Sequence, residues 1–523
     1  MTILRYYHTL KYLRGDQLFH RISHALKSRL YPVKPYKINT SIDFRLPGTV
    51  THFPMKQGKY LGGNRFRLLN IEHDFQGQID WSFDDYGMLW TFQLNYFDFL
   101  LDESCSQLDA VRLMDEWCDA EPRLTVGKMA YPISLRTINW LKAMIRFGHS
   151  ESRHVGVIRC ELQRLMSNLE YHVLGNHLLE NVLALIFGGL SFQEQHWLTK
   201  GLQILDREIP EQFLDDGGHF ERSPMYQQIL LERMLDTLNL ALASTIGDPV
   251  VMRLEPLVKR MFAWLDQMTF PNGELAHVND SAPGMSMTTA ALSAYARDLG
   301  IERMEASPSL GASGYRRMDS GSLSCIMDAG DVGPDYLPAH AHSDTLSFYL
   351  AVNGQPCIVD TGTSTYQSDA IRQRERSTSA HNTVMIDARE QSEAWGSFRM
   401  ARRAHARILE EGEGLLKATH DGYQRFGAGH VRQWDWSDGV LVIMDEVWGG
   451  SQYEAFFHLA PGLDIEQKTD GVYVAGPLSL NFSGAQQIVI EAYEFAEAFN
   501  RRVPASRFRV FFTGSLRTEC RST

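Results

Sequence analysis

Imidazole and carboxylate side chains gather in one short region of the second half of the chain. His340, His342 and Asp344 alternate in the run HAHSD, and Asp360 and His381 follow soon after it. On an extended segment, alternate side chains point to the same side. Neutral imidazole and carboxylate are good ligands for a divalent ion such as zinc. These residues could therefore form a metal site, or they could be histidines at the surface near strand ends.

The sequence around this cluster predicts a β-hairpin. LSFYLAV and QPCIVD are apolar runs of strand length, joined by Asn353-Gly354, a pair typical of tight hairpin turns. The return strand ends at Asp360, so the hairpin would carry this carboxylate back toward His342. The run AHNTVMID begins a further strand and supplies His381. Two histidines and one aspartate from three strand ends could thus share one ion.

Two polar motifs interrupt an otherwise apolar, helical part of the chain. In LGNHLLEN, Asn176 and His177 begin a helix, and Glu180 follows one turn later on the same face. Helix capping and a favourable first-turn acid would also explain this pattern. In DGGHFERSPMY, a Ser-Pro pair opens a helix with Tyr226 in its first turn. Tyr226 could pack in the core, or it could transfer a proton at a cleft between domains.

Three arginines alternate in the segment 371–377, between two of the candidate metal ligands. Arg372, Arg374 and Arg376 could bind an anionic sugar, or they could belong to a solvated charged loop. The net charge of −12 argues against nucleic acid as a partner. It also means that any site for an anionic ligand must be locally basic.

Composition places the chain among ordinary globular proteins. Its 523 residues are enough for two or more domains, and its six cysteines are scattered without a disulfide framework. We find no signal-peptide pattern and no apolar stretch that could span a bilayer, so the sequence predicts a cytoplasmic protein without a transmembrane segment. Residues 1–30 are basic and amphipathic, which predicts a helix docked on the body or one that lies on a membrane surface.

The spacing of apolar residues changes along the sequence and divides the chain into parts. Residues 100–304 have helical periodicity with short loops, which indicates antiparallel helix pairs in a bundle or an α/α toroid. Residues 305–314 are small and polar and form the expected linker. Residues 315–523 contain many short strands and turns, which predicts an antiparallel β-sandwich. Residues 1–99 are expected to be a helical and extended segment that packs on the helical domain.

Most of the chain resembles the heparinase II/III-like polysaccharide lyases, which include alginate and oligoalginate lyases. The segment QIDWSFDDYGMLWTFQLNYFDFL is followed, in the family's order, by NHLLEN, DGGHFERSPMY, HAHSDTLSFYL, IVDTGTSTY and RSTSAHNTV. Each string is short, but their order and their division between a helical part and a strand part are specific. The resemblance implies a multidomain α+β fold, with an N-terminal α/α toroid followed by a C-terminal antiparallel β-sandwich.

The resemblance also implies roles for residues of the helical part. Asn176 and His177 match the pair that binds and neutralises a uronic carboxylate, and Tyr226 matches the catalytic tyrosine. Glu180 matches a nearby acid, and Arg136 falls where the family often has an arginine that lines the toroid cleft.

In the sandwich, His340 matches a histidine that faces the cleft. His342, Asp360 and His381 match zinc ligands, and the zinc is expected to be structural. Together these matches imply an enzyme that cleaves an acidic polysaccharide by β-elimination. The absence of a visible secretion signal favours a role in exopolysaccharide or lipopolysaccharide metabolism. A glycoside hydrolase, a uronyl epimerase and a glycan-binding assembly factor without activity remain alternatives.

Overall fold

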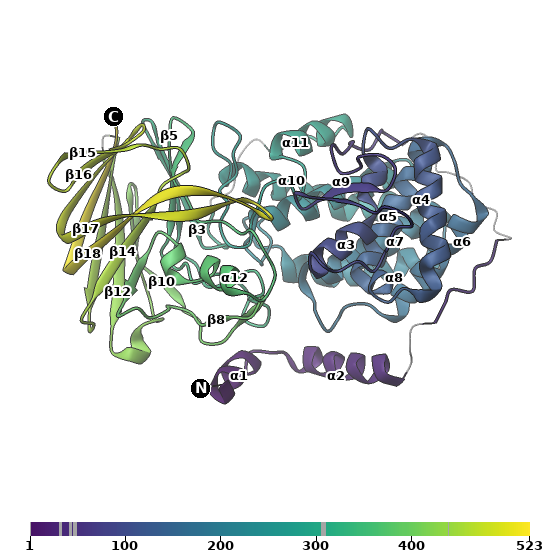
Figure 1. Cartoon of the computed structure of the whole chain (residues 1–523), viewed down its shortest axis with the longest axis horizontal. Helices are drawn as coiled ribbons and strands as arrows, with labels where there is room; N and C mark the ends of the chain where they lie inside the picture. The colour runs from purple at the N-terminus through teal and green to yellow at the C-terminus, as the bar shows by residue number, and fades with distance from the viewer. Residues whose placement is uncertain (1, 31–33, 41–43, 45–49, 305–309, 438) are drawn as a thin grey trace.

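The computed structural model describes residues 2–30, 34–40, 44, 50–304, 310–437 and 439–523. Helices fill one half of the molecule and strands fill the other, side by side along the long axis (Figure 1). This is the expected order of an α/α toroid followed by an antiparallel β-sandwich.

The helical domain is built around a helix that is apolar on all sides after its first two turns. This helix, α7 (Gly175–Phe192), is buried along nearly its whole length and packs against α5, α8 and α9. A helix without a polar face is stable only when other helices surround it. The helices of this domain are α3 (Met88–Tyr96), α4 (Gln107–Ala120), α5 (Ala130–Phe147), α6 (Ser152–Ser167), α7, α8 (Gln195–Gln212), α9 (Pro224–Leu242), α10 (Asp248–Gln267) and α11 (Thr289–Asp298).

Two antiparallel sheets form the sandwich. The smaller sheet has the order β3-β4-β5-β6, and the larger has the order β10-β11-β12-β13-β18-β17-β16-β15, with β14 pairing with β18 and β7. The strands of the smaller sheet are β3 (Tyr315–Ser320), β4 (Leu323–Asp328), β5 (Phe348–Val352) and β6 (Gln355–Ile358). The remaining strands are β7 (Val384–Ile386), β8 (Ala394–Trp395), β9 (Arg399–Met400), β10 (Ala406–Gly412), β11 (Leu415–His420), β12 (Gly429–Ser437), β13 (Val440–Trp448), β14 (Tyr453–His458), β15 (Ile465–Thr469), β16 (Val472–Ala475), β17 (Leu478–Ala498) and β18 (Arg501–Ser522).

The smaller sheet is buried on both faces. Cys325 and Leu350 belong to the core between the sheets, together with Trp434 of the larger sheet. The opposite face packs on the helices, where Tyr315 meets Trp264 of α10. Because one sheet serves both cores, the toroid and the sandwich share a continuous apolar boundary.

The predicted hairpin is confirmed. β5 and β6 pair antiparallel, and the two residues between them have positive φ, 50° at Asn353 and 78° at Gly354. This is the backbone geometry that an Asn-Gly pair adopts most readily. Of the expected linker, residues 305–309 lie outside the described residues, and strand structure begins at Tyr315.

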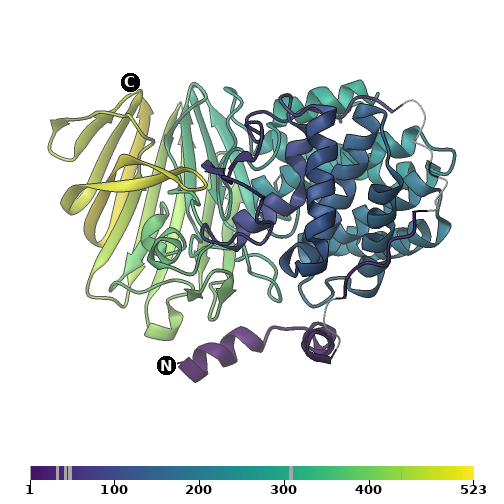
Figure 2. The ribbon, with the colours of Figure 1, turned by 45° about the vertical axis from the view of Figure 1, so that its right-hand side comes forward.

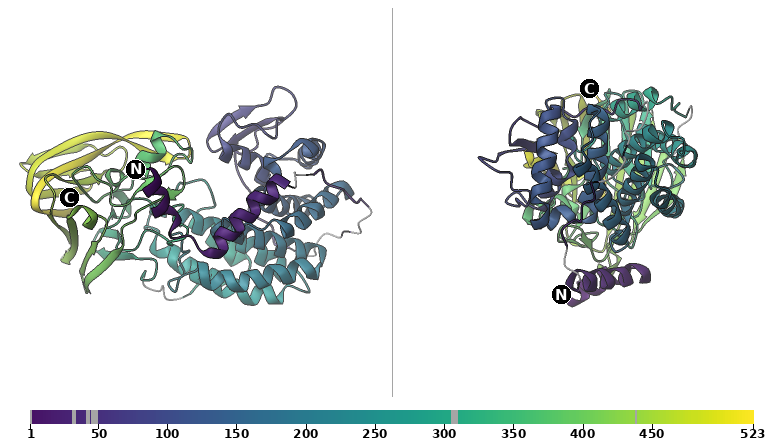
Figure 3. Two further views of the ribbon diagram at one scale, coloured as in Figure 1. Left: turned by 90° about the horizontal axis from the view of Figure 1, so that it is seen from below. Right: turned by 90° about the vertical axis from the view of Figure 1, so that its right-hand side faces the viewer.

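The first helices differ from the rest. α1 (Thr2–Leu10) and α2 (Gly15–Leu30) lie outside both domains and cross the junction between them, α1 on the sandwich side and α2 on the toroid side (Figures 2 and 3). We call residues 2–30 the N-terminal strap. After it, a hairpin of β1 (Arg65–Leu68) and β2 (Ile71–Asp74) leads into the toroid. No described helix is both long and apolar enough to cross a bilayer.

Candidate active site between the two domains

A cavity of about 760 Å³ lies between the toroid and the sandwich. The toroid contributes Asn176, His177 and Tyr226 to its wall, and the sandwich contributes His340 and Tyr366. The four residues for which the sequence implied catalytic roles therefore meet around one space, although they come from two domains.

Local sequence explains the position of Tyr226. Ser223 caps α9 by accepting a hydrogen bond from the Tyr226 backbone N–H at 3.3 Å, and Pro224 occupies the first turn. The Tyr226 ring lies 4.0 Å from the His340 ring, measured between centroids, and its hydroxyl lies 3.3 Å from the Tyr366 hydroxyl. Burial and the Tyr366 neighbour raise the pKa of Tyr226 well above its usual value, so its hydroxyl keeps its proton near neutral pH.

Carboxylates hold His340 from two sides. Its Nδ1 lies 3.0 Å from Oδ2 of Asp280, and its Nε2 lies 3.8 Å from Oε2 of Glu221. Asp280 also accepts hydrogen bonds from both terminal nitrogens of Arg372, one of them at 2.6 Å. The ring of His340 is thereby fixed beside Tyr226 and cannot turn without breaking the contact with Asp280.

Asn176 and His177 lie at the start of α7, where Leu174 and Gly175 both have positive φ. A Cβ at Gly175 would lie 2.2 Å from a carboxylate oxygen of Glu221, so the close approach of Glu221 depends on the glycine. The Asn176 amide nitrogen donates to Glu221 at 2.9 Å, whereas its buried Oδ1 has no protein partner. Asn176 therefore offers a hydrogen-bond acceptor to a ligand in this conformation.

His177 has its own carboxylate partner. Its Nδ1 lies 3.2 Å from Oε1 of Glu170, which is fixed in turn by Asn181. Burial lowers the pKa of His177, but the nearby carboxylates of Glu170, Glu221 and Glu180 together outweigh this effect and raise the pKa above its usual value. A protonated His177 can pair with an anionic ligand group.

The cavity wall has more arginines than acidic side chains, although the chain has a net charge of −12; the acidic residues of the wall are Asp98, Glu221 and Asp335. The arginines of the wall are Arg21, Arg233, Arg399 and Arg403. Nε of Arg233 lies 3.4 Å from Oε2 of the buried Glu180, and this ion pair holds the partly exposed guanidinium at the cavity wall. An anionic polymer can therefore find positive charge from both domains.

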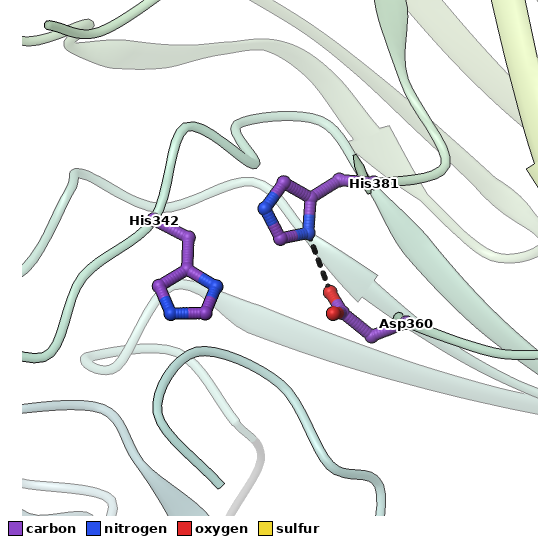
Figure 4. A group of neighbouring side chains, drawn as sticks. All are labelled: His342, Asp360 and His381. Atoms are coloured by element: carbon purple, nitrogen blue, oxygen red, sulfur yellow. Dashed lines mark hydrogen bonds and ion pairs between the residues drawn. The ribbon is translucent and has the colours of Figure 1, made fainter. Parts of the chain in front are cut away.

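The candidate metal ligands also come together. His342, Asp360 and His381 are buried and point toward one another, with one ligand atom of each within 4.8 Å of the others (Figure 4). Nε2 of His342 lies 2.9 Å from Asp280, whereas its buried Nδ1 has no partner. A carboxylate on one imidazole nitrogen and a free lone pair on the other is the usual arrangement of a zinc-binding histidine. The residues present therefore fit the zinc that the resemblance implies. Asp344 is buried nearby, but it is not one of these three.

The structure corrects the expectation for Arg136. It does not line the cavity but is fully buried, stacked on Trp117 at 4.0 Å and bonded through Nε to Glu161 at 2.9 Å. Glu180 is also not a cavity residue: it is fully buried behind Arg233, and burial raises its pKa to about 7. Neither side chain can touch a ligand in this conformation, because both are enclosed by neighbouring helices.

The structure also does not place the three arginines of segment 371–377, predicted to bind sugar, at the cavity. Most of this segment is a short helix, α12 (Ala370–Glu375), and none of the three arginines lines the cavity. Arg372 is bound to Asp280, and Arg376 donates to the Ala341 carbonyl at 2.9 Å. Arg374 is exposed and pairs with Glu494 at 2.7 Å. The two buried arginines instead hold residues 340–342 (the HAH segment) in place, Arg372 through Asp280 and Arg376 through the Ala341 carbonyl.

Sequence reasoning missed several residues of the site. Tyr366 had a signal in the sequence, because it ends the IVDTGTSTY string. Arg233 also had a signal, since it follows Tyr226 by two turns on the same face of α9. Glu221 likewise lies within the DGGHFERSPMY string, whereas Asp280 had no signal, because a single carboxylate in a loop gives no indication of which histidine it will meet.

Comparisons with known proteins agree with this architecture. The family model "Heparinase II/III-like, C-terminal" matches residues 302–522, and "Heparinase II/III N-terminus" matches residues 162–298. A heparin-sulfate lyase of Bacteroides stercoris is 28% identical over 106 residues, which is 20% of this chain and 16% of that protein. A heparin-sulfate lyase of Pedobacter heparinus is 24% identical over 245 residues, which is 42% of this chain and 37% of that protein. The chain thus matches less than half the length of either relative.

Solved structures share the fold at low sequence identity. A crystal structure of heparinase III has a TM-score of 0.65 and 17% identity, and the match covers 85% of this chain and 79% of that one. The heparan sulfate lyase of Pedobacter heparinus has a TM-score of 0.54 and 17% identity, with 88% and 81% covered. These likenesses establish the order of toroid and sandwich.

Proposed function

The chain belongs to the heparinase II/III-like family, and we propose that it is a polysaccharide lyase that cleaves an acidic, uronate-containing polysaccharide by β-elimination. The observation that carries this proposal is the meeting of Tyr226, His340 and Tyr366 in a basic cavity between the two domains. The relatives named as heparin-sulfate lyases support the same reaction class.

The proposed substrate follows from the charges of the cavity. Protonated His177 and the arginines of the wall favour an anionic sugar, and both domains contribute to the cavity that would hold it. Among acidic polymers we propose a uronate-containing exopolysaccharide or lipopolysaccharide chain.

The reaction requires removal of a proton that is not acidic in water. The carbon alpha to a uronate carboxylate holds its proton tightly while the carboxylate is charged, and positive charge or hydrogen bonds at the carboxylate lower the cost of the enolate-like transition state. His177 would supply the positive charge. Asn176 lies beside it, and its unpaired Oδ1 would accept a hydrogen bond from a sugar hydroxyl.

The two rings that are in contact, His340 and Tyr226, would transfer the protons. His340, oriented by Asp280, would take the alpha proton; the released electron pair forms the new double bond and the bond to the glycosidic oxygen breaks. Tyr226 would give its proton to the departing oxygen, because its raised pKa keeps it protonated until that charge develops. A proton passed from His340 to Tyr226 would then restore both groups.

We propose a structural zinc at His342, Asp360 and His381. When bound, the ion would tie the HAH segment to the strand ends that follow it and so steady His340. The shared Asp280 supports this link, because the same carboxylate contacts both His340 and His342.

Incubation with a panel of acidic glycans tests the function. The panel should include glycosaminoglycans, alginate and bacterial uronate-containing exopolysaccharides. Elimination creates a conjugated double bond that absorbs ultraviolet light, and its products together have the mass of the substrate. Hydrolysis would add one water to the combined mass of the products for each bond cleaved, and its products would not gain ultraviolet absorbance. Epimerisation would leave the chain length unchanged, and binding without any new product would support an assembly factor.

A further inference from the structure

The N-terminal strap docks on the molecule through its polar side. In α2, Gln17, His20, Arg21 and His24 face the body at helical spacing. Arg21 donates to the carbonyl of His172 at 3.1 Å, and the rings of His24 and His172 stack at 3.9 Å. Gln17 is fully buried, and His20 stacks on Tyr171 at 5.0 Å.

α1 docks on the other domain. The Thr9 hydroxyl lies 3.1 Å from the indole nitrogen of Trp395, and the Tyr6 ring meets the same indole at 4.9 Å. Between the two helices, Arg403 of the sandwich stacks on Tyr12 at 3.9 Å. The strap therefore bridges the toroid and the sandwich, and polar and aromatic contacts hold it there.

The apolar side of the strap faces outward. Phe19 is 67% exposed and Leu30 is 69% exposed, although both are large apolar residues. Successive turns of α2 place Leu18, Phe19, Ile22, Leu26 and Leu30 on the side away from the docking contacts. In α1, Ile3, Leu4 and Tyr7 are likewise exposed. An amphipathic helix that turns its apolar face to water normally has a partner for that face.

The charge of the strap indicates the kind of partner. Residues 1–30 contain six Lys or Arg residues and a single Asp, whereas the whole chain has a net charge of −12. Lys11, Lys27 and Arg29 are exposed close to the apolar face. Apolar side chains bordered by Lys and Arg are the composition of helices that lie in the surface of an anionic bilayer. The acidic remainder of the chain would be repelled, so only the strap side would face such a surface.

We propose that the N-terminal strap attaches this protein to the surface of an anionic lipid bilayer. The outer side of α1 and α2 enters the interface, and Lys11, Lys27 and Arg29 contact lipid phosphates. The inner side of the strap, through Tyr6, Leu13 and Arg21, forms part of the cavity wall. Attachment would therefore hold the candidate active site next to the membrane, where a lipid-linked polysaccharide would be presented. The attachment itself does not depend on the lyase assignment.

Flotation with lipid vesicles tests this proposal on the full chain. The protein should float with vesicles of phosphatidylcholine and phosphatidylglycerol, and it should bind vesicles of phosphatidylcholine alone much more weakly. A Phe19→Ser, Ile22→Ser, Leu26→Ser variant should lower the partition coefficient at least roughly 100-fold, because each side chain of this size contributes about tenfold when it enters an apolar phase. A Lys27→Gln, Arg29→Gln variant should bind less and lose much of its salt dependence.

A matched variant controls for the loss of exposed apolar surface in general. Leu108 in α4 and Met252 in α10 are 80% and 76% exposed but lie outside the strap. Leu108→Ser, Met252→Ser should float like the wild type. Equal flotation of the Phe19 variant, or equal binding to both kinds of vesicle, would overturn the proposal. The proposal would also be overturned if the wild type bound neither kind of vesicle but self-associated through Phe19, Ile22 and Leu26. The partner of the apolar face would then be a second copy of this chain.

Discussion

Replacing Tyr226 with phenylalanine tests whether the hydroxyl of Tyr226 is catalytic or structural. Tyr226→Phe keeps the ring that packs against His340 and deletes only the group that we propose to protonate the departing oxygen. The ring is buried beside Met225 and Phe499, so its packing should survive the change. We therefore expect a folded protein that binds substrate and does not turn it over.

The structure limits the expected loss of stability. The Tyr226 hydroxyl has one side-chain contact, the 3.3 Å approach to Tyr366, which is long for a hydrogen bond between hydroxyls. A neutral hydrogen bond contributes about 0.5–1.5 kcal/mol, so the loss should lie at or below the lower end of this range. The thermal unfolding midpoint should then stay close to that of the wild type.

The expected loss of activity is much larger. Removal of one general acid or base commonly lowers the rate about 10²–10⁴-fold, which corresponds to roughly 3–5 kcal/mol of transition-state stabilisation. Because Tyr226 acts on the leaving group, kcat should fall while KM for an acidic oligosaccharide changes little. Ultraviolet absorbance of the unsaturated product measures both constants.

Tyr295→Phe provides the matched control. Tyr295 is a buried tyrosine of α11 outside the cavity, and its hydroxyl bonds to Asn239 at 2.9 Å and to Asp236 at 3.2 Å. Its loss should cost about 1–3 kcal/mol of stability, because buried polar partners remain unsatisfied, and should spare turnover. Near-normal turnover in Tyr226→Phe would refute its assignment as the acid. Unfolding of that variant, with Tyr295→Phe stable, would show that the Tyr226 hydroxyl is structural.

Three further predictions concern other parts of the site. Glu170→Gln should lower the pKa of His177, because the Glu170 carboxylate raises it. Since only the protonated imidazole neutralises a carboxylate, the alkaline limb of the kcat/KM profile should move to lower pH. An unchanged limb would exclude His177 as the group that neutralises the substrate carboxylate. Metal analysis should find about one zinc per chain, and His381→Ala should lose it and melt at a lower temperature, whereas a metal-free wild type would contradict the site. Arg399→Gln should weaken binding of an acidic oligosaccharide about tenfold at low salt, whereas Arg374→Gln, which removes an exposed arginine outside the cavity, should not.

Local signals in the sequence accounted for most of the fold. The Asn353-Gly354 turn, the Ser223 cap and the apolar run of α7 each act over a few residues, and the structure has a hairpin, a helix start and a central helix at these places. Such features can be predicted because backbone conformation and helix capping depend on near neighbours. The division into helices before Asp298 and strands from Tyr315 follows from the same short-range periodicities.

Long charged side chains were predicted less well. Arg136 was expected to line the cleft, and Arg372 and Arg376 were predicted to bind an anionic sugar, but each is buried and bonded to a carboxylate or to backbone carbonyls. An arginine can extend several ångströms in any direction from its Cα. Its destination therefore depends on which carboxylates and carbonyls the fold brings within reach, and those come from distant parts of the chain.

By itself, the sequence determined the types of residue available for chemistry and the elements that carry them: a tyrosine in the first turn of a capped helix, an Asn-His pair at a helix start, and histidines beside a hairpin. Only the tertiary structure decided how they meet. Asp280, from a loop of the helical domain, contacts His340, His342 and Arg372 of the sandwich at once. The strap, too, docks through its polar side and turns its apolar side outward, although its pattern alone would also fit a helix docked through the apolar side. Both outcomes depend on contacts between residues far apart in the chain, which neither short-range spacing nor helical periodicity encodes.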